Sequence, residues 1–250
     1  MTAGRRPFGL LLAAHGERRA DADNASVVRL ARNLADKGVA AEIGFGFIKG
    51  SPTVDEAIAA LLSRDVVVYP LFLSDGYFTR VALPRLVEEA KRRDQGRAIV
   101  ILPPLGLEPA LADVIADETV AAAHLRAKVP AETLIILLAH GSEKDQASRV
   151  ATERLADRMR QRKCFYDTRL ALLEELPSLA EAIEGASRPI IVVGLFASEG
   201  MHGADDARRL VAELKRDDVM LIGPAGTFAG IEAVIASAVT KHYGLERKNA

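Results

Sequence analysis

The sequence predicts an α/β fold that consists of two tandem, doubly wound parallel-sheet domains related by internal duplication. Short runs of Leu, Ile and Val alternate with longer segments of helical periodicity, which is typical of βαβ units around a parallel sheet. The chain also repeats itself, because GLLLAAHGE around His15 recurs as IILLAHGSE around His140. The alternation predicts the fold class, and the repeat predicts that the fold occurs twice.

Three further segments repeat in the same order along the chain. IKGSPTVDEAI matches EELPSLAEAI, YPLFLSDGYF matches VGLFASEGMH, and LPPLG matches IGPAG. Collinear matches of this kind indicate duplication rather than chance similarity. The charged segment HLRAKVPAE separates the copies, so we expect one domain over residues 1–127 and a second over residues 128–250.

The second copy shows the expected elements most clearly. Its short apolar runs predict four strands, near residues 134–139, 168–173, 190–196 and 219–223. Apolar residues at helical spacing predict helices over residues 147–160 and 205–214. In a doubly wound sheet of order 2-1-3-4, the first strand lies between the second and the third, and ligands bind at the carboxyl ends where the order switches.

Composition excludes several classes of protein. The 250 residues are 49% hydrophobic and 27% charged, with a net charge of −1, which is typical of a globular domain and not of a nucleic-acid binder. The single cysteine, Cys164, excludes an intrachain disulfide and a multi-thiolate metal site. The first apolar run, Phe8 to Ala14, is too short to span a bilayer. We therefore expect a cytoplasmic protein, monomeric or homo-oligomeric, without nucleic-acid or membrane partners.

Three polar residues of the second copy follow consecutive predicted strands. His140 follows the first strand, Glu174 the second and His202 the third. Adjacent parallel strands lie about 4.8 Å apart, so side chains at three neighbouring strand ends can converge on one ion. Two imidazoles and a carboxylate suit cobalt, nickel, iron or zinc better than magnesium or calcium. The sequence therefore predicts a divalent metal site with His140 and His202 as ligands.

Structural explanations of these residues remain open on sequence alone. His140 is also compatible with a buried, hydrogen-bonded histidine, and His202 with an exposed loop residue. Glu174 and its neighbour Glu175 are equally compatible with solvated loop carboxylates, and the spacing does not say which of them assists. Ser142 lacks the context of a nucleophile, and a hydroxyl that caps the following helix or binds a carboxylate fits better.

The first copy departs from this pattern. Its equivalents of the three positions are His15, Lys49 and Phe78, so only one metal ligand is retained. We expect this copy to form a wall of a binding site, where Lys49, Arg80 and Arg18 attract carboxylates and either Phe78 or Tyr77 packs on a flat ring. Ordinary solvated side chains are the alternative for all three cations.

The segments LLAAHGE, FIKGSPTVDEAI, LLAHGS and GLFASEGMH resemble the class II chelatases of the CbiX, SirB and CbiK type. The resemblance covers nearly the whole chain. It implies two chelatase-like, flavodoxin-like domains that insert cobalt, or iron or nickel, into sirohydrochlorin or a related tetrapyrrole in cobalamin or sirohaem biosynthesis. The metal ion is then a substrate, the tetrapyrrole is an anionic partner, and no organic cofactor is required.

The resemblance also assigns roles to residues. His140 and His202 match the family's metal-binding histidines, and Glu174 lies near the carboxylate that assists in some members. Phe78 departs from the second histidine, which implies a degenerate site in the first domain. His15, Lys49, Phe78 and Arg80, together with Ser142, are then expected to contact the substrate.

Two other readings fit the same residues. A tetrapyrrole or metal carrier would retain the fold without turnover, in keeping with the histidine missing from the first copy. An anion-binding α/β enzyme would instead use the backbone amides after Gly16 and Gly141 and need no metal.

Overall fold

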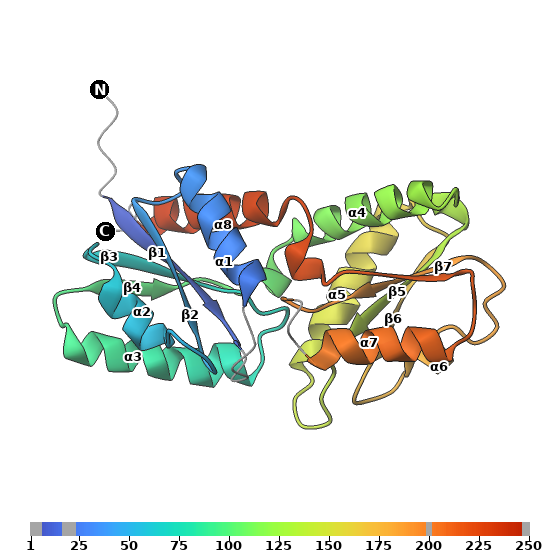
Figure 1. The fold of residues 1–250 in the computed structure, drawn as a ribbon, viewed down its shortest axis with the longest axis horizontal. Helices are drawn as coiled ribbons and strands as arrows, with labels where there is room; N and C mark the ends of the chain where they lie inside the picture. The colour runs from blue at the N-terminus through green and yellow to red at the C-terminus, as the bar shows by residue number, and fades with distance from the viewer. Residues whose placement is uncertain (1–6, 17–23, 199–201, 247–250) are drawn as a thin grey trace. The chain divides into compact units, whose positions relative to one another are not determined.

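The computed structural model describes the backbone of residues 7–16, 24–198 and 202–246, and their side chains except those of residues 202 and 242–246. The chain forms two compact units (Figure 1). The first unit contains Met1–Phe72, Tyr77–Leu105 and Glu232–Ala250, and the second contains Leu73–Gly76 and Gly106–Ile231. Both units are α/β, as the alternation of apolar runs and helical segments predicts.

The first unit is built on a parallel sheet of order β2-β1-β3-β4. Its strands are β1 (Phe8–Ala14), β2 (Glu42–Phe47), β3 (Asp65–Pro70) and β4 (Ala98–Ile101). Its helices are α1 (Ala25–Asp36), α2 (Val54–Ala60), α3 (Leu83–Arg93) and α8 (Ile231–Glu246), and a π-helical turn, Phe78–Ala82, leads into α3. All residues of β1 are buried, as expected of a central parallel strand that is covered on both faces.

The second unit repeats this arrangement with a parallel sheet of order β6-β5-β7-β8. Its strands are β5 (Leu134–Ala139), β6 (Asp167–Leu172), β7 (Ile190–Gly194) and β8 (Val219–Ile222). Its helices are α4 (Leu111–Leu125), α5 (Ala147–Arg162), α6 (Leu179–Ala182) and α7 (His202–Glu213), and short 3-10 turns lie at Leu105–Leu107, Pro130–Glu132 and Ala225–Thr227. The predicted strands, the two predicted helices and the order 2-1-3-4 are confirmed.

Equivalent local features confirm the duplication. Gly16 and Gly141, which follow the first strand of each copy, both have positive φ values, of 73° and 75°. A capping box begins the second helix of each copy, with Thr53 and Glu56 in one and Ser178 and Glu181 in the other. The glycine after the first strand and the capping box of the second helix therefore occupy equivalent positions in the two copies.

The last helix of each copy belongs to the other compact unit. Helix α4 follows β4 in the sequence but packs on α5 and β7, and Figure 1 shows α8 beside α1. Asn33 of α1 donates a hydrogen bond of 2.8 Å to Glu232 of α8. The units therefore differ from the halves 1–127 and 128–250 expected above, because helical periodicity does not say which sheet a helix will cover.

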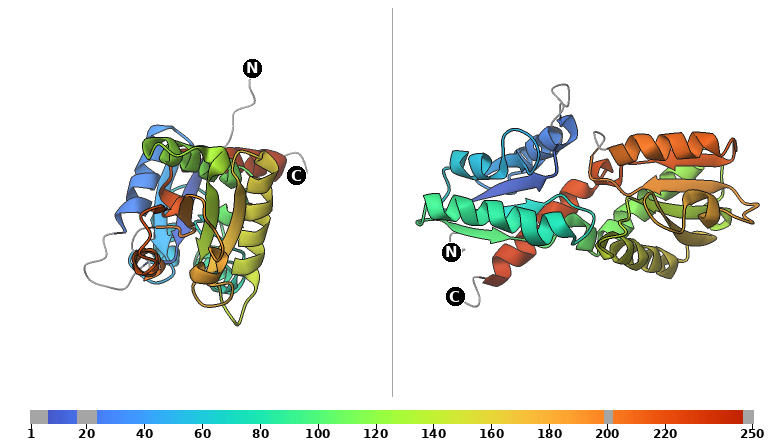
Figure 2. Two further views of the ribbon diagram at one scale, coloured as in Figure 1. Left: turned by 90° about the vertical axis from the view of Figure 1, so that its right-hand side faces the viewer. Right: turned by 90° about the horizontal axis from the view of Figure 1, so that it is seen from below.

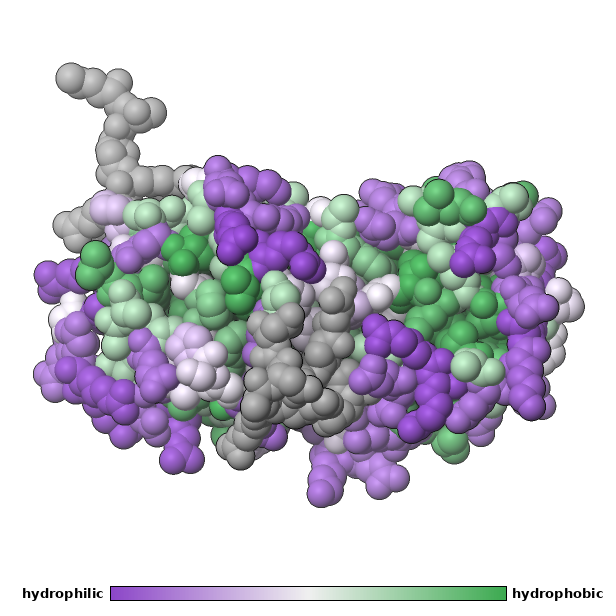
Figure 3. Space-filling model, in the orientation of Figure 1, coloured by the Kyte–Doolittle hydropathy of each residue, from purple (hydrophilic) through white to green (hydrophobic). Residues whose placement is uncertain are grey.

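Each unit buries its own apolar layer and leaves charged side chains outside. In the second unit, Leu134, Ile136 and Leu138 of β5 pack with Leu179 and Ala207 of the flanking helices in one core cluster. Figure 3 shows apolar groups between α4 and α7, where all four residues of the edge strand β8 are half-buried. Within the described residues, no helix is both long enough and apolar enough to cross a membrane.

Two further views of the ribbon show the strand arrows of each unit running on into loops (Figure 2). In the second unit, the loops after β5, β6 and β7 lead to the three residues of the predicted metal site, His140, Glu174 and His202. The doubly wound order therefore puts the candidate site where such folds bind ligands.

Candidate functional site

Backbone hydrogen bonds hold His140 and Glu174 side by side. The register pairs Ala139, the last residue of β5, with Leu172, the last residue of β6, so the two strands end at the same level of the sheet. The pairing continues one step beyond the strands, because Glu174 N–H donates to the His140 carbonyl oxygen at 3.0 Å. The fold thus brings together two of the three predicted site residues, although 34 positions (174 − 140) separate them in the sequence.

The two side chains face solvent and each other. His140 Nδ1 lies 3.7 Å from Glu174 Oε1, and the side chains are 49% and 58% exposed. The exposure excludes the alternative of a buried structural histidine. The separation is too long for a hydrogen bond, yet both atoms can lie about 2.0–2.2 Å from one divalent ion, as histidine and carboxylate ligands do.

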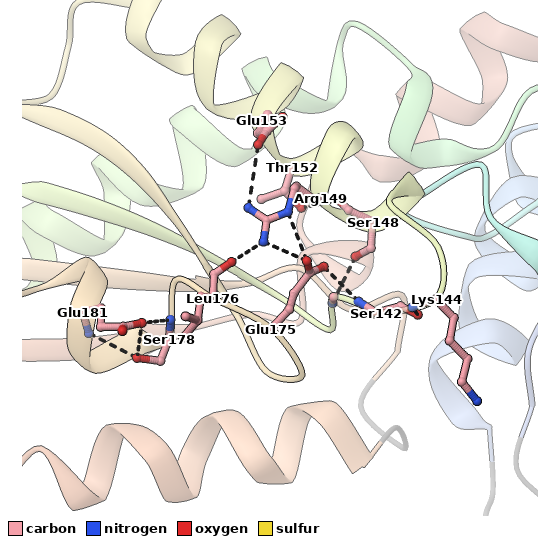
Figure 4. A network of polar contacts seen from close by, with 11 residues as sticks. Ser142, Lys144, Ser148, Arg149, Thr152, Glu153, Glu175, Leu176, Ser178 and Glu181 are labelled. Atoms are coloured by element: carbon pink, nitrogen blue, oxygen red, sulfur yellow. Dashed lines mark hydrogen bonds and ion pairs between the residues drawn. The ribbon is translucent and has the colours of Figure 1, made fainter.

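The structure distinguishes Glu174 from Glu175. The Glu175 carboxylate is only 10% exposed, accepts a hydrogen bond of 3.0 Å from Ser142 N–H, and pairs with Arg149 at 2.7 Å (Figure 4). The Ser142 hydrogen bond lowers the pKa of Glu175 below its ordinary value against the effect of burial, and Arg149 lowers it further. Both oxygens of the Glu175 carboxylate are therefore hydrogen-bonded within the protein, and Glu174 is the carboxylate that faces the candidate site.

His202 is the first residue of α7, directly after the loop that follows β7. Its side chain lies outside the described residues, as does the preceding segment 199–201. The described side chains contain no group of three or more His, Cys, Asp or Glu residues that could hold a metal ion. His140 and Glu174 are thus two candidate ligands that lie side by side, and the approach of His202 to them stays a prediction.

Ser142 acts through its backbone and through a local turn. Its N–H binds Glu175, and its hydroxyl accepts a hydrogen bond of 3.3 Å from Lys144 N–H. Helix α5 begins at Ala147, five residues beyond Ser142. Its N-cap residue is Gln146, whose side chain makes no capping hydrogen bond. The expectation that the Ser142 hydroxyl caps this helix is therefore wrong: the loop is too long, and the hydroxyl closes a turn within it.

The first unit repeats the backbone of this site with different chemistry. Lys49 N–H donates to the His15 carbonyl oxygen at 2.7 Å, as Glu174 does to His140. The Phe78 ring meets the His15 ring edge to face at a centroid distance of 4.6 Å, and Lys49 Nζ lies 5.6 Å from the Phe78 centroid. Phe72 stacks on the same ring, Arg80 is exposed, and Arg18 lies outside the described residues. The equivalent hydrogen bonds confirm that Lys49 stands at the position of Glu174, and the equivalence of Phe78 and His202 stays a prediction.

The sequence reading missed Arg149 as a partner of the site. It lies in the first turn of α5, where a helix pattern assigns an arginine to the solvated face. One signal was available, since Glu175 stands where the first copy has Gly50, the residue after Lys49. A carboxylate gained next to the site in only one copy indicates a partner elsewhere in that copy.

The chain matches a family model over most of its length. The CbiX family model matches residues 9–122 and again residues 134–242, which cover both copies of the repeat. A relative from Halobacterium salinarum, described as a probable sirohydrochlorin cobaltochelatase, is 23% identical over 217 residues, which are 79% of this chain and 74% of that protein.

Solved structures show the same fold. A structure described as CbiX, the terminal enzyme for biosynthesis of siroheme in denitrifying bacteria, has a TM-score of 0.72 and 25% identity, with 93% of this chain and 98% of that one covered. A multi-domain protein of Deinococcus radiodurans with structural similarity to chelatases has a TM-score of 0.80 and 22% identity. The match covers 94% of this chain but only 55% of that longer protein, which carries two additional domains. Since one family model covers both copies of the repeat, the chain belongs to the CbiX family of class II chelatases, as its motifs predict.

Proposed function

We propose that this chain inserts a divalent metal ion into sirohydrochlorin, with cobalt as the favoured metal. The observation that carries the proposal is the exposed pair of His140 and Glu174, with donor atoms 3.7 Å apart, at the carboxyl edge of the second sheet. Family membership supplies the reaction class, and the site supplies ligands that suit such an ion. Iron and nickel suit the same ligands. One relative is described as a cobaltochelatase and another as an enzyme of siroheme biosynthesis, so these relatives do not select the metal.

Insertion requires the site to handle protons as well as the ion. A tetrapyrrole that takes up a divalent ion loses two pyrrole N–H protons. His140 and His202 are assigned to the incoming ion, and Glu174 is assigned to one proton, because a carboxylate 58% exposed can pass it to water. His140 accepts the other proton as it releases the ion, since neutral imidazole is a base near neutral pH.

The first unit is assigned to substrate binding. The Phe78 ring, with Phe72 stacked on it, offers an apolar face to a flat macrocycle. Lys49 beside this ring and the exposed Arg80 provide positive charge for the carboxylates of an anionic tetrapyrrole. His15 contacts the Phe78 ring and belongs to the same surface. On the second unit, Ser142 belongs to the loop beside His140 and is assigned to the substrate as well.

A spectrophotometric insertion assay tests the proposal. Purified protein is mixed with sirohydrochlorin and Co²⁺, Ni²⁺ or Fe²⁺, and the change in tetrapyrrole absorption is followed. We expect His140→Ala and His202→Ala to abolish insertion, and Glu174→Gln to slow it about 100-fold, a typical contribution of a positioned acid or base. His124→Ala, on the exposed last turn of α4, is the matched control. Full activity of His140→Ala would refute the assignment.

A carrier of tetrapyrrole or metal is the second candidate. It is favoured by the first unit, where Phe78 closes on His15 and removes one of two potential insertion sites. A carrier would bind sirohydrochlorin with one-to-one stoichiometry and insert none of the three ions at any concentration. Multiple turnovers by the purified chain would exclude it.

A further inference from the structure

Two loops of the second unit are tied together by one carboxylate. The loop after β5 carries His140 and Ser142, and the loop after β6 carries Glu174 and Glu175. Glu175 Oε1 accepts the N–H of Ser142 at 3.0 Å, so the second loop holds the first. Figure 4 shows the Glu175 side chain directed back from the solvent-facing loops toward helix α5.

Arg149 of α5 holds this carboxylate from the other side. Its Nε and Nη2 atoms donate to Glu175 Oε2 at 3.1 and 2.7 Å, and Nη2 also donates to the Leu176 carbonyl oxygen. The Arg149 side chain is 24% exposed and that of Glu175 is 10% exposed, so water screens the pair less than it screens a surface ion pair. The Arg149 guanidinium therefore anchors helix α5 directly to the loop after β6. Through Glu175 it also holds the loop after β5.

Backbone geometry leaves little freedom at the junction. Gly141 N–H donates to Ser148 Oγ of α5 at 3.2 Å. A Cβ at Gly141 would lie 2.9 Å from Glu175 Cγ, closer than real Cβ contacts. The residue between His140 and Ser142 is therefore packed directly against the carboxylate that Arg149 holds.

In the first unit, a glycine stands at the position of this carboxylate. Lys49 occupies the position of Glu174, as the equivalent hydrogen bonds to His15 and His140 show, so Gly50 stands in place of Glu175. Glycine has no side chain to bind the preceding loop or an arginine. Among the residues that the structure describes, the tie thus occurs in the unit that carries the exposed histidine and carboxylate pair and not at the equivalent position of the other unit.

We infer that Arg149 and Glu175 are positioning residues that set the separation of His140 and Glu174 for the incoming metal ion. This inference rests on the proposed function. Neither residue touches the ion; Glu175 fixes the loop of His140 relative to its own neighbour Glu174, and Arg149 fixes Glu175. Groups that orient metal ligands typically contribute about 10- to 100-fold to metal affinity or activity.

The variants Arg149→Ala, Arg149→Lys and Glu175→Gln test this role. We expect Arg149→Ala to lower kcat for insertion by about 10- to 100-fold and to weaken Co²⁺ binding in the same range. Arg149→Lys keeps the charge but loses the fork that meets Glu175 and Leu176, so we expect only partial rescue. The double variant of Arg149→Ala and Glu175→Gln should lose little more than the stronger single variant, because the two residues act as one unit.

Arg216 offers a matched control within the same unit. Its Nε and Nη2 atoms donate to the Asp218 carboxylate at 3.0 and 2.7 Å, and Nη1 donates to the Ala186 carbonyl oxygen, which copies the partners of Arg149. This group lies before β7 and β8, at the opposite end of the sheet from His140. Arg216→Ala should therefore change stability but leave kcat and Co²⁺ affinity within about twofold.

Co²⁺ binding is read from its visible absorption spectrum, independently of turnover. If wild type binds Co²⁺ through His140 but inserts none, the proposed function fails, and the inference is judged on affinity and spectrum alone. Wild-type Co²⁺ affinity and kcat in a folded Arg149→Ala variant would overturn the inference. Equal losses in Arg149→Ala and Arg216→Ala would overturn it as well, since they would show a general effect of stability. Absence of Co²⁺ binding that depends on His140 would overturn both.

Discussion

Two adjacent glutamates of the second unit have different surroundings. Glu174 is 58% exposed and faces His140, whereas Glu175 is 10% exposed and is held by Ser142 N–H and Arg149. A carboxylate with fixed partners inside the protein is a poor proton carrier, and one in contact with water is a good one. The structure thus separates a carboxylate that faces solvent and His140 from one that is bound by groups of the protein.

At the same scale, Gly141→Ala should damage stability and site together. Its φ of 75° is strained for alanine, at a cost of roughly 1–2 kcal/mol, and the new Cβ would also collide with Glu175. Gly185, with φ 69° and nothing within 4 Å of a Cβ, isolates the backbone cost. We expect urea unfolding to show a larger loss for Gly141→Ala than for Gly185→Ala, and insertion to fall only in the former. Equal losses would mean that the contact with Glu175 is relieved without consequence.

Residue patterns led to part of the site and not to the rest. His140 and Glu174 follow from the rule that consecutive parallel strands end at one edge, and backbone pairing confirms that they are neighbours. The link between Arg149 and Glu175 depends on the direction of the Arg149 side chain, at the third residue of helix α5. The spacing of residues in the sequence does not encode this direction. The side chain of His202 lies outside the described residues, so its role stays a prediction.

Among the elements, β8 begins next to an ion pair between Arg216 and Asp218. Arg216 donates hydrogen bonds to Asp218, just before Val219, and holds the pKa of Asp218 below its ordinary value of 3.8. A lowered native pKa stabilises the folded state above the unfolded value, and this contribution is lost as pH falls through the native value. We therefore expect wild type to exceed Arg216→Ala in free energy of unfolding near neutral pH, and this difference to shrink as the pH falls below 3.8 and through the native pKa of Asp218. An undiminished difference in acid would show that Arg216 acts through packing instead.

The strands were predictable, and the partners of the helices were not. Central parallel strands such as β5 and β7 are buried along their whole length, so their apolar runs stand out in the sequence. Helices α4 and α8 are also visible as helical patterns, yet each belongs to the compact unit of the other copy. Periodicity reports that a helix has an apolar face, and the fold alone determines which sheet that face meets.

Over the whole molecule, duplication has been followed by division of chemistry. Both units keep the strand order, the positive-φ glycine after the first strand and the backbone hydrogen bond that follows it. One unit then carries His140 and Glu174 with the Arg149 anchor, and the other carries an aromatic cluster around Phe78 with Lys49 beside it. A shared backbone thus supports a histidine and carboxylate edge in one copy and an apolar, cationic edge in the other.

The exchange of the last helices predicts that the two sequence halves will not fold separately. A fragment of residues 1–127 lacks α8, whose buried Ile235 and Val239 pack in the first unit and whose Glu232 binds Asn33. A fragment of residues 128–250 lacks α4, whose Asp113 and Asp117 pair with Arg162 of α5. We expect each fragment alone to show weak protection in hydrogen exchange, because an apolar face of its sheet stays uncovered. Mixing the fragments should restore protection in both, and native-like protection in either fragment alone would show that its sheet does not need the exchanged helix.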